Sequence, residues 1–530
     1  MPQHQGTSDQ LEQYRAEARV PWHAAGIRTT SLPSRGMQPI AWAWLGVVLL
    51  AAFGLRIGLA VLLPNVHHAD EVFQALEPAH RLWFDWGVVS WEWRDGVRSW
   101  LFPGLLAGVM GLTDGLTGGP HDYLASIAVV LSILSLGVVV VGFLLGHRLF
   151  GLPGAVITSG LCAIWYDLIY IAPKTLSEAP AAHILVIALY LLGTPGETDS
   201  SRRYWAAGVL LGLTFCFRFH TAPAILFAAV YACRWHVRER WLPVIIGGLI
   251  PVLAVGVLDA LTWGLPFQSI WKNLWINIVE GRSRDYGASP PLWYFVWMIE
   301  AWGGAVAPMA ALFVVGARRA PLLAGAAVVH VLAHMPIAHK EFRFLYPVMP
   351  LIVILIGLGT AEIASKVSSM LAGGRSRLRA VVGGALAAWA VTSTALAVSP
   401  DYRGNWSRFT ELIRATERAG AAPDLCGLGL VGIPWWATGG YTRLHRAVPM
   451  YYLPEPESLD DAMSAFNHLL IPKPLEPAAT GFAEVQCWAA SPPNEYGDPL
   501  NPPVCLMRRT GGCIADARYE LNTVLTARDE

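Results

Sequence analysis

The side chains that could do chemistry concentrate between residues 67 and 103, directly after an apolar run long enough to cross a membrane. The segment is dense in carboxylates, basic groups and tryptophans, and Asp70 and Glu71 begin a stretch with the spacing of an amphipathic helix. Carboxylates at the edge of a bilayer are costly unless they are paired or solvated, so their density here predicts a functional site. Two structural alternatives stay open: Asp70 could cap the helix, and the tryptophans could anchor the loop in the membrane interface.

A second cluster is the run HKEFRF (339–344), in which charges of both signs stand beside aromatic rings at the end of another apolar run. Cations on the outer side of a membrane oppose the usual distribution of charge, and a lipid phosphate would explain them. Arg343 offers a planar fork of donors and Lys340 a point charge, so we expect both to bind phosphate, with His339 beside them. Simple anchoring of the loop is the alternative.

Three further segments add polar groups. The loop 263–292 mixes tryptophans and amides with basic residues, a content that suits carbohydrate, although an ordered interfacial hairpin has the same composition. The run APKTLSEAP (172–180) contains Glu178, and FRFHTAP (217–223) contains Arg218. We expect these groups to join the same polar site.

The composition is that of a membrane protein. The chain has 530 residues, of which 54% are hydrophobic and 14% charged. Lys+Arg and Asp+Glu balance at 38 each, so no global field favours nucleic acid as a partner. We predict roughly eleven passes from the apolar runs, at 40–63, 122–145, 153–172, 180–193, 205–218, 220–233, 243–262, 293–315, 321–337, 345–365 and 380–398.

The basic residues fall in alternate connections between these runs, which the positive-inside rule assigns to the cytoplasm. Residues 1–39 then form a cytoplasmic arm, and residues 40–398 a transmembrane domain. The outer side receives the loops 64–121, 173–179, 263–292 and 338–344 together with the whole segment 399–530. The unusual polar residues therefore share one side of the membrane.

Residues 399–530 are richer in Pro and acidic residues and hold no run of spanning length, so we predict a small, separate, soluble α/β domain. Its short apolar runs at 425–433 and 468–472 indicate strands, and 407–420 has helical spacing. Four cysteines lie here, at 426, 487, 505 and 513. An even number in an oxidising compartment permits two disulfides, whose pairing stays open.

Five motifs occur in the order found in a known family. They are HHADEVFQALEPAH from residue 67, SWEWRDGVRSWLFP from 90, FRFHTAP from 217, NIVEGRSRDYGASPPLWY from 277 and HKEFRFLYPVMPL from 339. Together they resemble the Alg9-like mannosyltransferases over about residues 40 to 400, and the last is most similar to the form in the enzyme that adds the third mannose of glycosylphosphatidylinositol. The chain departs from the family at Ala69, where Pro is common, and in FRFHTA, where FRPTA is common.

The resemblance implies a polytopic α-helical membrane protein of the GT-C type that takes mannose from a polyprenyl or dolichyl phosphate, with inversion, and transfers it to a glycan or glycolipid at the non-cytoplasmic face. Asp70 and Glu71 match the acidic pair of the family motif, and Asp70 is the candidate proton acceptor. His339, Lys340 and Arg343 would stabilise the departing phosphate. The substrate-binding candidates within the motifs and loops are His68, Glu77, Trp91, Glu92, Arg98, Glu178, Arg218 and Tyr286. We expect no metal or other cofactor, because the leaving group is a lipid phosphomonoester and its departure does not strictly require a metal ion.

Two other functions are compatible with the sequence. A flippase or transporter for a lipid-linked sugar would also need many spans and polar groups, but its functional residues should lie near the membrane midplane. A GT-C transferase could also use another lipid-linked sugar. The expected partners are a lipid-linked donor, a glycan or glycolipid acceptor and membrane lipids. The expected membrane is the plasma membrane in a bacterium or that of the endoplasmic reticulum in a eukaryote.

Overall fold

Every apolar run identified in the sequence lies largely in helix. A computed structural model describes residues 37–117, 119–193, 200–370, 374–489 and 503–529, and the predicted arm 1–39 lies almost wholly outside them. The chain divides into two units, Met1–Ala43 and Trp44–Glu530, and the second contains nearly all of the described residues. Six described helical stretches have the length and composition to cross a membrane, and four shorter ones are apolar. The chain is therefore an integral membrane protein.

The membrane-embedded part consists of apolar helices, and its two longest connections are residues 63–119 and 264–292. The helices are α2 (Pro39–Leu62), α6 (Pro120–Ile164), α7 (Tyr166–Ile171), α8 (Glu178–Gly193), α9 (Ser201–Phe217), α10 (Ala222–Cys233), α11 (Leu242–Trp263), α13 (Trp293–Trp302), α14 (Val306–Ala317), α15 (Pro321–His334), α16 (Met349–Met370) and α17 (Gly374–Ala397). The predicted runs 122–145 and 153–172 meet within α6, which breaks at Gly151, where φ is 65°. The sequence did not predict the apolar helix α5 (Leu101–Asp114).

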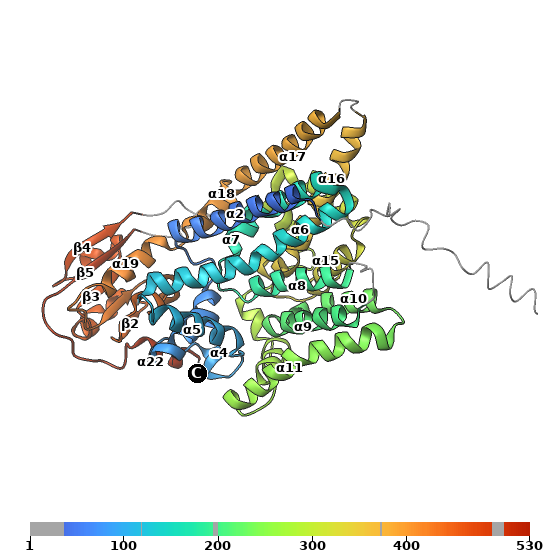
Figure 1. Ribbon diagram of the computed structural model, residues 1–530. Coiled ribbons are helices and arrows are strands. Elements are labelled where there is room, and N and C mark those ends of the chain that lie inside the picture. The colour runs from blue at the N-terminus through green and yellow to red at the C-terminus, as the bar shows by residue number, and fades with distance from the viewer. Residues whose placement is uncertain (1–36, 118, 194–199, 371–373, 490–502, 530) are drawn as a thin grey trace, which may run out of the picture. The chain divides into compact units, whose positions relative to one another are not determined.

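The helix α16 is buried along most of its length and packs against α6 and α14. Gly316 and Gly359 permit this approach, because a Cβ on Gly316 would stand 1.9 Å from the carbonyl oxygen of Leu355. Small residues at such crossings let helix backbones approach closely in a membrane. The helices α9 and α11 likewise lie side by side (Figure 1).

The loops predicted to share one side of the membrane lie against one another. Arg98 in the first accepts a hydrogen bond at its carbonyl from the Trp263 indole, and Lys174 in the second donates to the carbonyl of Asn65. The loop 263–292 also contacts the loop 338–344, since His339 lies 3.2 Å from the carbonyl oxygen of Gly287. Short helices order the first of these loops: η1 (Glu71–Leu76), α3 (Glu77–Phe84) and α4 (Trp91–Arg94).

The C-terminal segment forms a five-stranded mixed sheet. Its strands are β1 (Leu428–Val431), β2 (Met450–Leu453), β3 (His468–Pro472), β4 (Ala483–Trp488) and β5 (Val504–Arg508), in the order β2-β1-β3-β5-β4. The first three run parallel and the last two antiparallel to their neighbours. The helix α19 (Thr410–Gly420) packs beside β3 and β5 (Figure 1). The predicted helix at 407–420 and the predicted strands at 425–433 and 468–472 are therefore confirmed.

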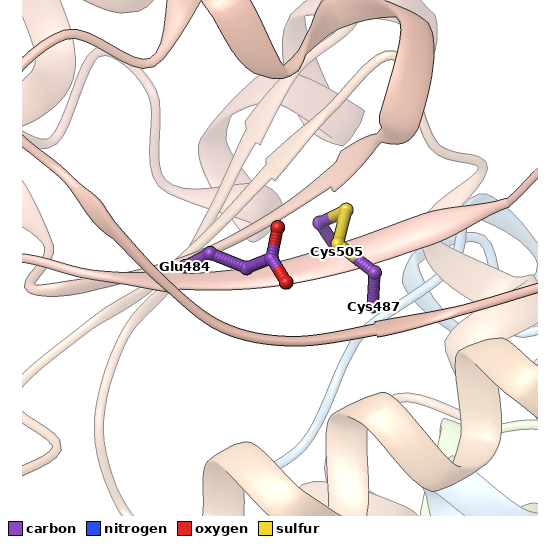
Figure 2. A group of neighbouring side chains, drawn as sticks. All are labelled: Glu484, Cys487 and Cys505. Carbon is purple, nitrogen blue, oxygen red and sulfur yellow. A yellow bond between two sulfur atoms is a disulfide. The ribbon is translucent and has the colours of Figure 1, made fainter.

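The four C-terminal cysteines form the two disulfides that their even number permits, and the pairs are Cys426–Cys513 and Cys487–Cys505. Within the described residues, Glu484, Cys487 and Cys505 are the one group with the spacing of metal ligands (Figure 2). Both sulfurs belong to the disulfide across β4 and β5, and Glu484 pairs with Lys473 at 3.0 Å. A disulfide sulfur is not the thiolate that binds zinc, so this group is structural.

The C-terminal segment is not separate from the rest of the chain, because residues 44–530 form one unit. The backbone N–H of Val89 donates to Asn522 Oδ1 at 2.9 Å, and Arg94 donates to the carbonyl of Leu525. The first loop, residues 64–121, therefore contacts the C-terminal helix α22 (Leu521–Asp529).

Candidate active site

Asp70 lies immediately before η1, and its side chain makes no capping hydrogen bond to that helix. Its Oδ2 instead lies 2.6 Å from Nη2 of Arg343, and its Oδ1 lies 3.6 Å from Nδ1 of His68. The interpretation of Asp70 as a plain helix cap is therefore wrong. One of these partners, Arg343, comes from the HKEFRF motif, which is far from Asp70 in the sequence.

Arg343 is the centre of the cluster. It is buried at the start of the turn Phe342–Val348 and pairs with three carboxylates, those of Asp70, Glu341 and Glu178. Glu178 in turn lies 2.7 Å from Nη2 of Arg218. Three carboxylates and two guanidiniums from four separate motifs thus form one connected ion network. Removing one member of such a network leaves buried charge without a partner, which is destabilising.

Glu341 joins the two histidines to this network. Its oxygens lie 3.1 Å from Nε2 of His68 and 2.9 Å from Nε2 of His339. The neighbouring carboxylates outweigh burial and raise the pKa of His68 to about 9. The ring is therefore a cation at neutral pH, with Nε2 donating to Glu341 and Nδ1 facing the Asp70 carboxylate.

The electrostatics of Asp70 follow from the same contacts. Burial alone would raise the pKa of its carboxyl, but the Arg343 guanidinium and His68 outweigh burial and hold that pKa well below its usual range. The resting carboxylate is thus ionised and paired. It becomes a useful proton acceptor only when the pairing with Arg343 loosens.

A small cavity of about 70 Å³ opens beside Asp70. Arg98 and Arg218 line it, together with Ser177 and Asn273. Arg98 pairs with Glu92, which also accepts a hydrogen bond from Gln74 at 3.2 Å. Three predicted substrate residues, Arg98, Glu178 and Arg218, therefore lie at this cavity or one contact from it, and Glu92 positions Arg98.

The aromatic candidates lie at the rim. The Arg282 guanidinium lies over the Trp91 ring, 3.7 Å from its centre, and the rings of Tyr286 and His339 are 6.2 Å apart. Tyr286 is exposed. These contacts join the loop 263–292 to the ion network through His339. Lys340 points elsewhere: its Nζ donates to the carbonyl of Ile337 and lies over the Tyr294 ring.

Two predicted carboxylates do not join the network. Glu71 is buried, and its Oε1 accepts hydrogen bonds from the backbone N–H groups of His67 and His68 at 2.7 and 3.3 Å. Glu77 is wholly buried and accepts hydrogen bonds from the N–H of Val88 at 2.8 Å and from the N–H and hydroxyl of Thr442, both at 2.7 Å. In place of substrate binding, the structure gives Glu77 a role in joining the first loop to the C-terminal segment.

The structure also adds a residue that the motif analysis passed over. Glu341 stands inside the HKEFRF run, yet we singled out only its basic residues, because phosphate binding calls for cations. The alternation of charge in that run was the available signal. A carboxylate between cations at a membrane edge indicates an ion network as readily as a phosphate site.

The chain is similar to known proteins in both sequence and fold. The model of the Alg9-like mannosyltransferase family matches residues 47–403. GPI mannosyltransferase 3 of Yarrowia lipolytica is 27% identical over 77% of this chain and 76% of its own length. GPI alpha-1,2-mannosyltransferase 3 of Xenopus laevis is 25% identical, and that alignment covers 60% of each chain. The apo structure of ArnT from Cupriavidus metallidurans superposes with a TM-score of 0.56 at 12% identity, covering 88% of this chain and 98% of that one. This chain belongs to the Alg9-like mannosyltransferase family and is a membrane mannosyltransferase with the GT-C fold.

Proposed function

We propose that the protein transfers mannose from a polyprenyl or dolichyl phosphate to a hydroxyl of a glycan or glycolipid, with inversion at the anomeric carbon. The observation that carries this proposal is the pair of Asp70 and Arg343, 2.6 Å apart. In this proposal Asp70 is the proton acceptor and Arg343 the cation that binds the phosphate, because a displacement needs one such group at each of the two reacting oxygens.

In this mechanism the acceptor hydroxyl gives its proton to Asp70 while its oxygen forms the new bond to the anomeric carbon. The bond from that carbon to the phosphate oxygen breaks, and its electron pair leaves with the phosphate. Arg343 moves from Asp70 towards the phosphate and stabilises its charge, which also frees Asp70 to accept a proton. Glu178 and Glu341 keep Arg343 in the site, and Arg218 neutralises Glu178. No step calls for a metal.

The names of the relatives support a glycolipid acceptor, since they are GPI mannosyltransferases. We infer that the acceptor of this protein is likewise a lipid-linked glycan. The loops 64–121, 173–179, 263–292 and 338–344 lie against one another, as loops on one side of a membrane would. This supports the eleven-pass topology, in which the site and the C-terminal segment are on the non-cytoplasmic face. At the opposite helix ends, Arg319 pairs with Glu362 at 2.7 Å and Lys366 with the same carboxylate at 2.8 Å, as expected of a cytoplasmic side.

The test is incubation of the purified protein in lipid with radiolabelled polyprenyl-phosphate mannose and candidate glycolipid acceptors, followed by analysis of the glycan and its linkage. We expect labelled mannose on the acceptor with inverted configuration, and loss of this product with Asp70→Asn. Labelled lipid that only changes leaflet in sealed vesicles would instead establish a flippase. Transfer from a nucleotide sugar but not from the lipid would overturn the proposed donor.

A further inference from the structure

A second and larger cavity lies on the other side of the segment that carries Asp70. Its volume is about 450 Å³, within the range of sites that bind small ligands. Glu71 and Thr175 line it, and Thr175 also lines the small cavity beside Asp70. Glu71 directly follows Asp70, which lines the small cavity, so the two cavities lie next to each other along this segment. The transfer step at Asp70 and Arg343 does not use it.

The walls of the cavity differ in character. One is apolar and comes from the end of α2 and the start of α6, including Leu59, Leu62, Leu124 and Ala125. Both helices have the length and composition of membrane spans, and Leu62 is 71% exposed. An aliphatic chain could therefore enter this side from the bilayer without leaving an apolar environment.

The rest of the lining is charged, and the C-terminal segment supplies part of it. Arg414, Arg443 and Glu417 come from that segment, and the cavity is also lined by Arg56, Lys174 and Glu71. Lys174 is buried, and its ammonium donates to two neutral oxygens of Asn65. Arg443 pairs with Glu417 through Nη1 alone, which leaves further N–H donors of its guanidinium for a ligand. The excess of cations favours an anion.

We propose that this cavity binds the phosphate-bearing headgroup of a lipid, with the phosphate at Lys174 and Arg443 and the chain along α2 and α6. The inference rests on the proposed function, because a transferase between two lipid-linked substrates needs two lipid sites that meet at Asp70. The family match ends at residue 403, so the wall formed by Arg414, Glu417 and Arg443 lies beyond it. The shared chemistry is a phosphate ester on a long chain, which both the donor and a phosphoglycolipid acceptor carry.

The test measures binding without turnover. Full-length protein in phosphatidylcholine nanodiscs is titrated with undecaprenyl phosphate and, separately, with phosphatidylinositol, and bound lipid is counted by native mass spectrometry. The double variant Arg414→Gln, Arg443→Gln should bind one or both lipids about tenfold or more weakly, the loss expected when a charge-assisted contact is removed. Arg518→Gln, an exposed arginine paired with Asp516, is the matched control and should bind as the wild type does.

The two lipids distinguish a donor site from an acceptor site. The proposed mechanism has the donor phosphate at Arg343, so we expect a selective loss of phosphatidylinositol binding, which identifies the site as that of the acceptor. A selective loss of undecaprenyl phosphate binding would contradict that placement of the donor phosphate, and loss of both would show a common phosphate site. A second variant, Ala125→Trp, fills the apolar side without changing charge and should weaken the same lipid. Binding of both lipids by both variants within about twofold of wild type would overturn the proposal.

Failure of the proposed function gives a different pattern. A wild-type protein that binds a lipid through Arg443 but transfers no mannose would contradict the transferase mechanism and leave this site in place. If the variants transfer mannose and bind lipid as the wild type does, the proposed lipid site is contradicted and the proposed transfer mechanism is not.

Discussion

Asp70 and Glu77 are carboxylates on one loop, seven residues apart, and their surroundings differ completely. Asp70 faces a guanidinium and a histidine, and these partners keep it ionised. Glu77 accepts hydrogen bonds from uncharged donors, those of Val88, Thr442 and the Tyr441 backbone, and burial raises its pKa to about 7. A charged partner that can move away is what a carboxylate that accepts a proton needs. Fixed neutral donors are instead typical of a buried carboxylate that holds two segments of the chain together. Both residues lie in one motif, so the kind of partner separates them where the sequence cannot.

The largest effect should come from Asp70→Asn. The amide keeps the size but does not accept a proton, so we expect mannose transfer to fall by about 10² to 10⁴-fold, the range for loss of a general base. Thermal unfolding should change little, because Arg343 keeps Glu178 and Glu341 as partners when the Asp70 charge is removed. Transfer within a few-fold of wild type, measured with polyprenyl-phosphate mannose, would show that Asp70 does not act as the base.

Arg343→Ala should weaken donor use next most, by about 10- to 150-fold, because a charge-assisted contact contributes roughly 1.5–3 kcal/mol. The variant also leaves Asp70, Glu178 and Glu341 without their cation, so its folding must be checked by thermal unfolding. Arg343→Lys keeps the charge and should recover part of the rate. Lys340→Ala should cost less, because Lys340 contacts the Ile337 carbonyl and not the network. Equal losses in both alanine variants would contradict this order.

Glu77→Ala should act on stability and not on chemistry. Removing the carboxylate leaves the donors of Val88 and Thr442 buried without an acceptor, at a cost of about 1–3 kcal/mol in the free energy of unfolding. We expect faster proteolysis of the C-terminal segment and a near-normal rate for the protein that remains folded. Glu476→Ala, which removes a surface partner of Lys473, is the control. A lost rate with unchanged stability would return Glu77 to the substrate-binding residues.

A smaller effect should appear with pH. The pKa of Glu77 in the folded protein, about 7, is above its ordinary value of 4.5, so folding favours the protonated form. Its contribution to stability should therefore be complete below about pH 4.5 and should be lost as the pH rises through about 7. Unfolding curves of the C-terminal segment across this range should show the loss, and Glu77→Gln should abolish that part of the dependence. The same pH dependence in both proteins would contradict the assignment.

The sequence predicted what depends on local pattern. Apolar runs located the membrane helices, and the run at 468–472 became β3, because burial alone determines both. The motifs also named most members of the ion network. The direction of individual side chains could not be predicted from the sequence. Asp70 and Glu71 are adjacent, but consecutive side chains on a helical turn point about 100° apart. The two residues therefore line different cavities. The contact of Glu77 with Thr442 joins segments with no shared pattern, so only the folded chain reveals it.

That contact also has a consequence for how the protein is made. The two Thr442 donors of Glu77 lie 365 residues further along the chain. At a synthesis rate of about 5–20 residues per second, the first loop therefore waits roughly 20 to 70 seconds before its partner is translated. Until then Glu77 has only the Val88 N–H, and a chain that stops before residue 442 never gains the rest. We therefore expect the loop that carries Asp70 to reach its final structure only after the segment containing Thr442 has been synthesised.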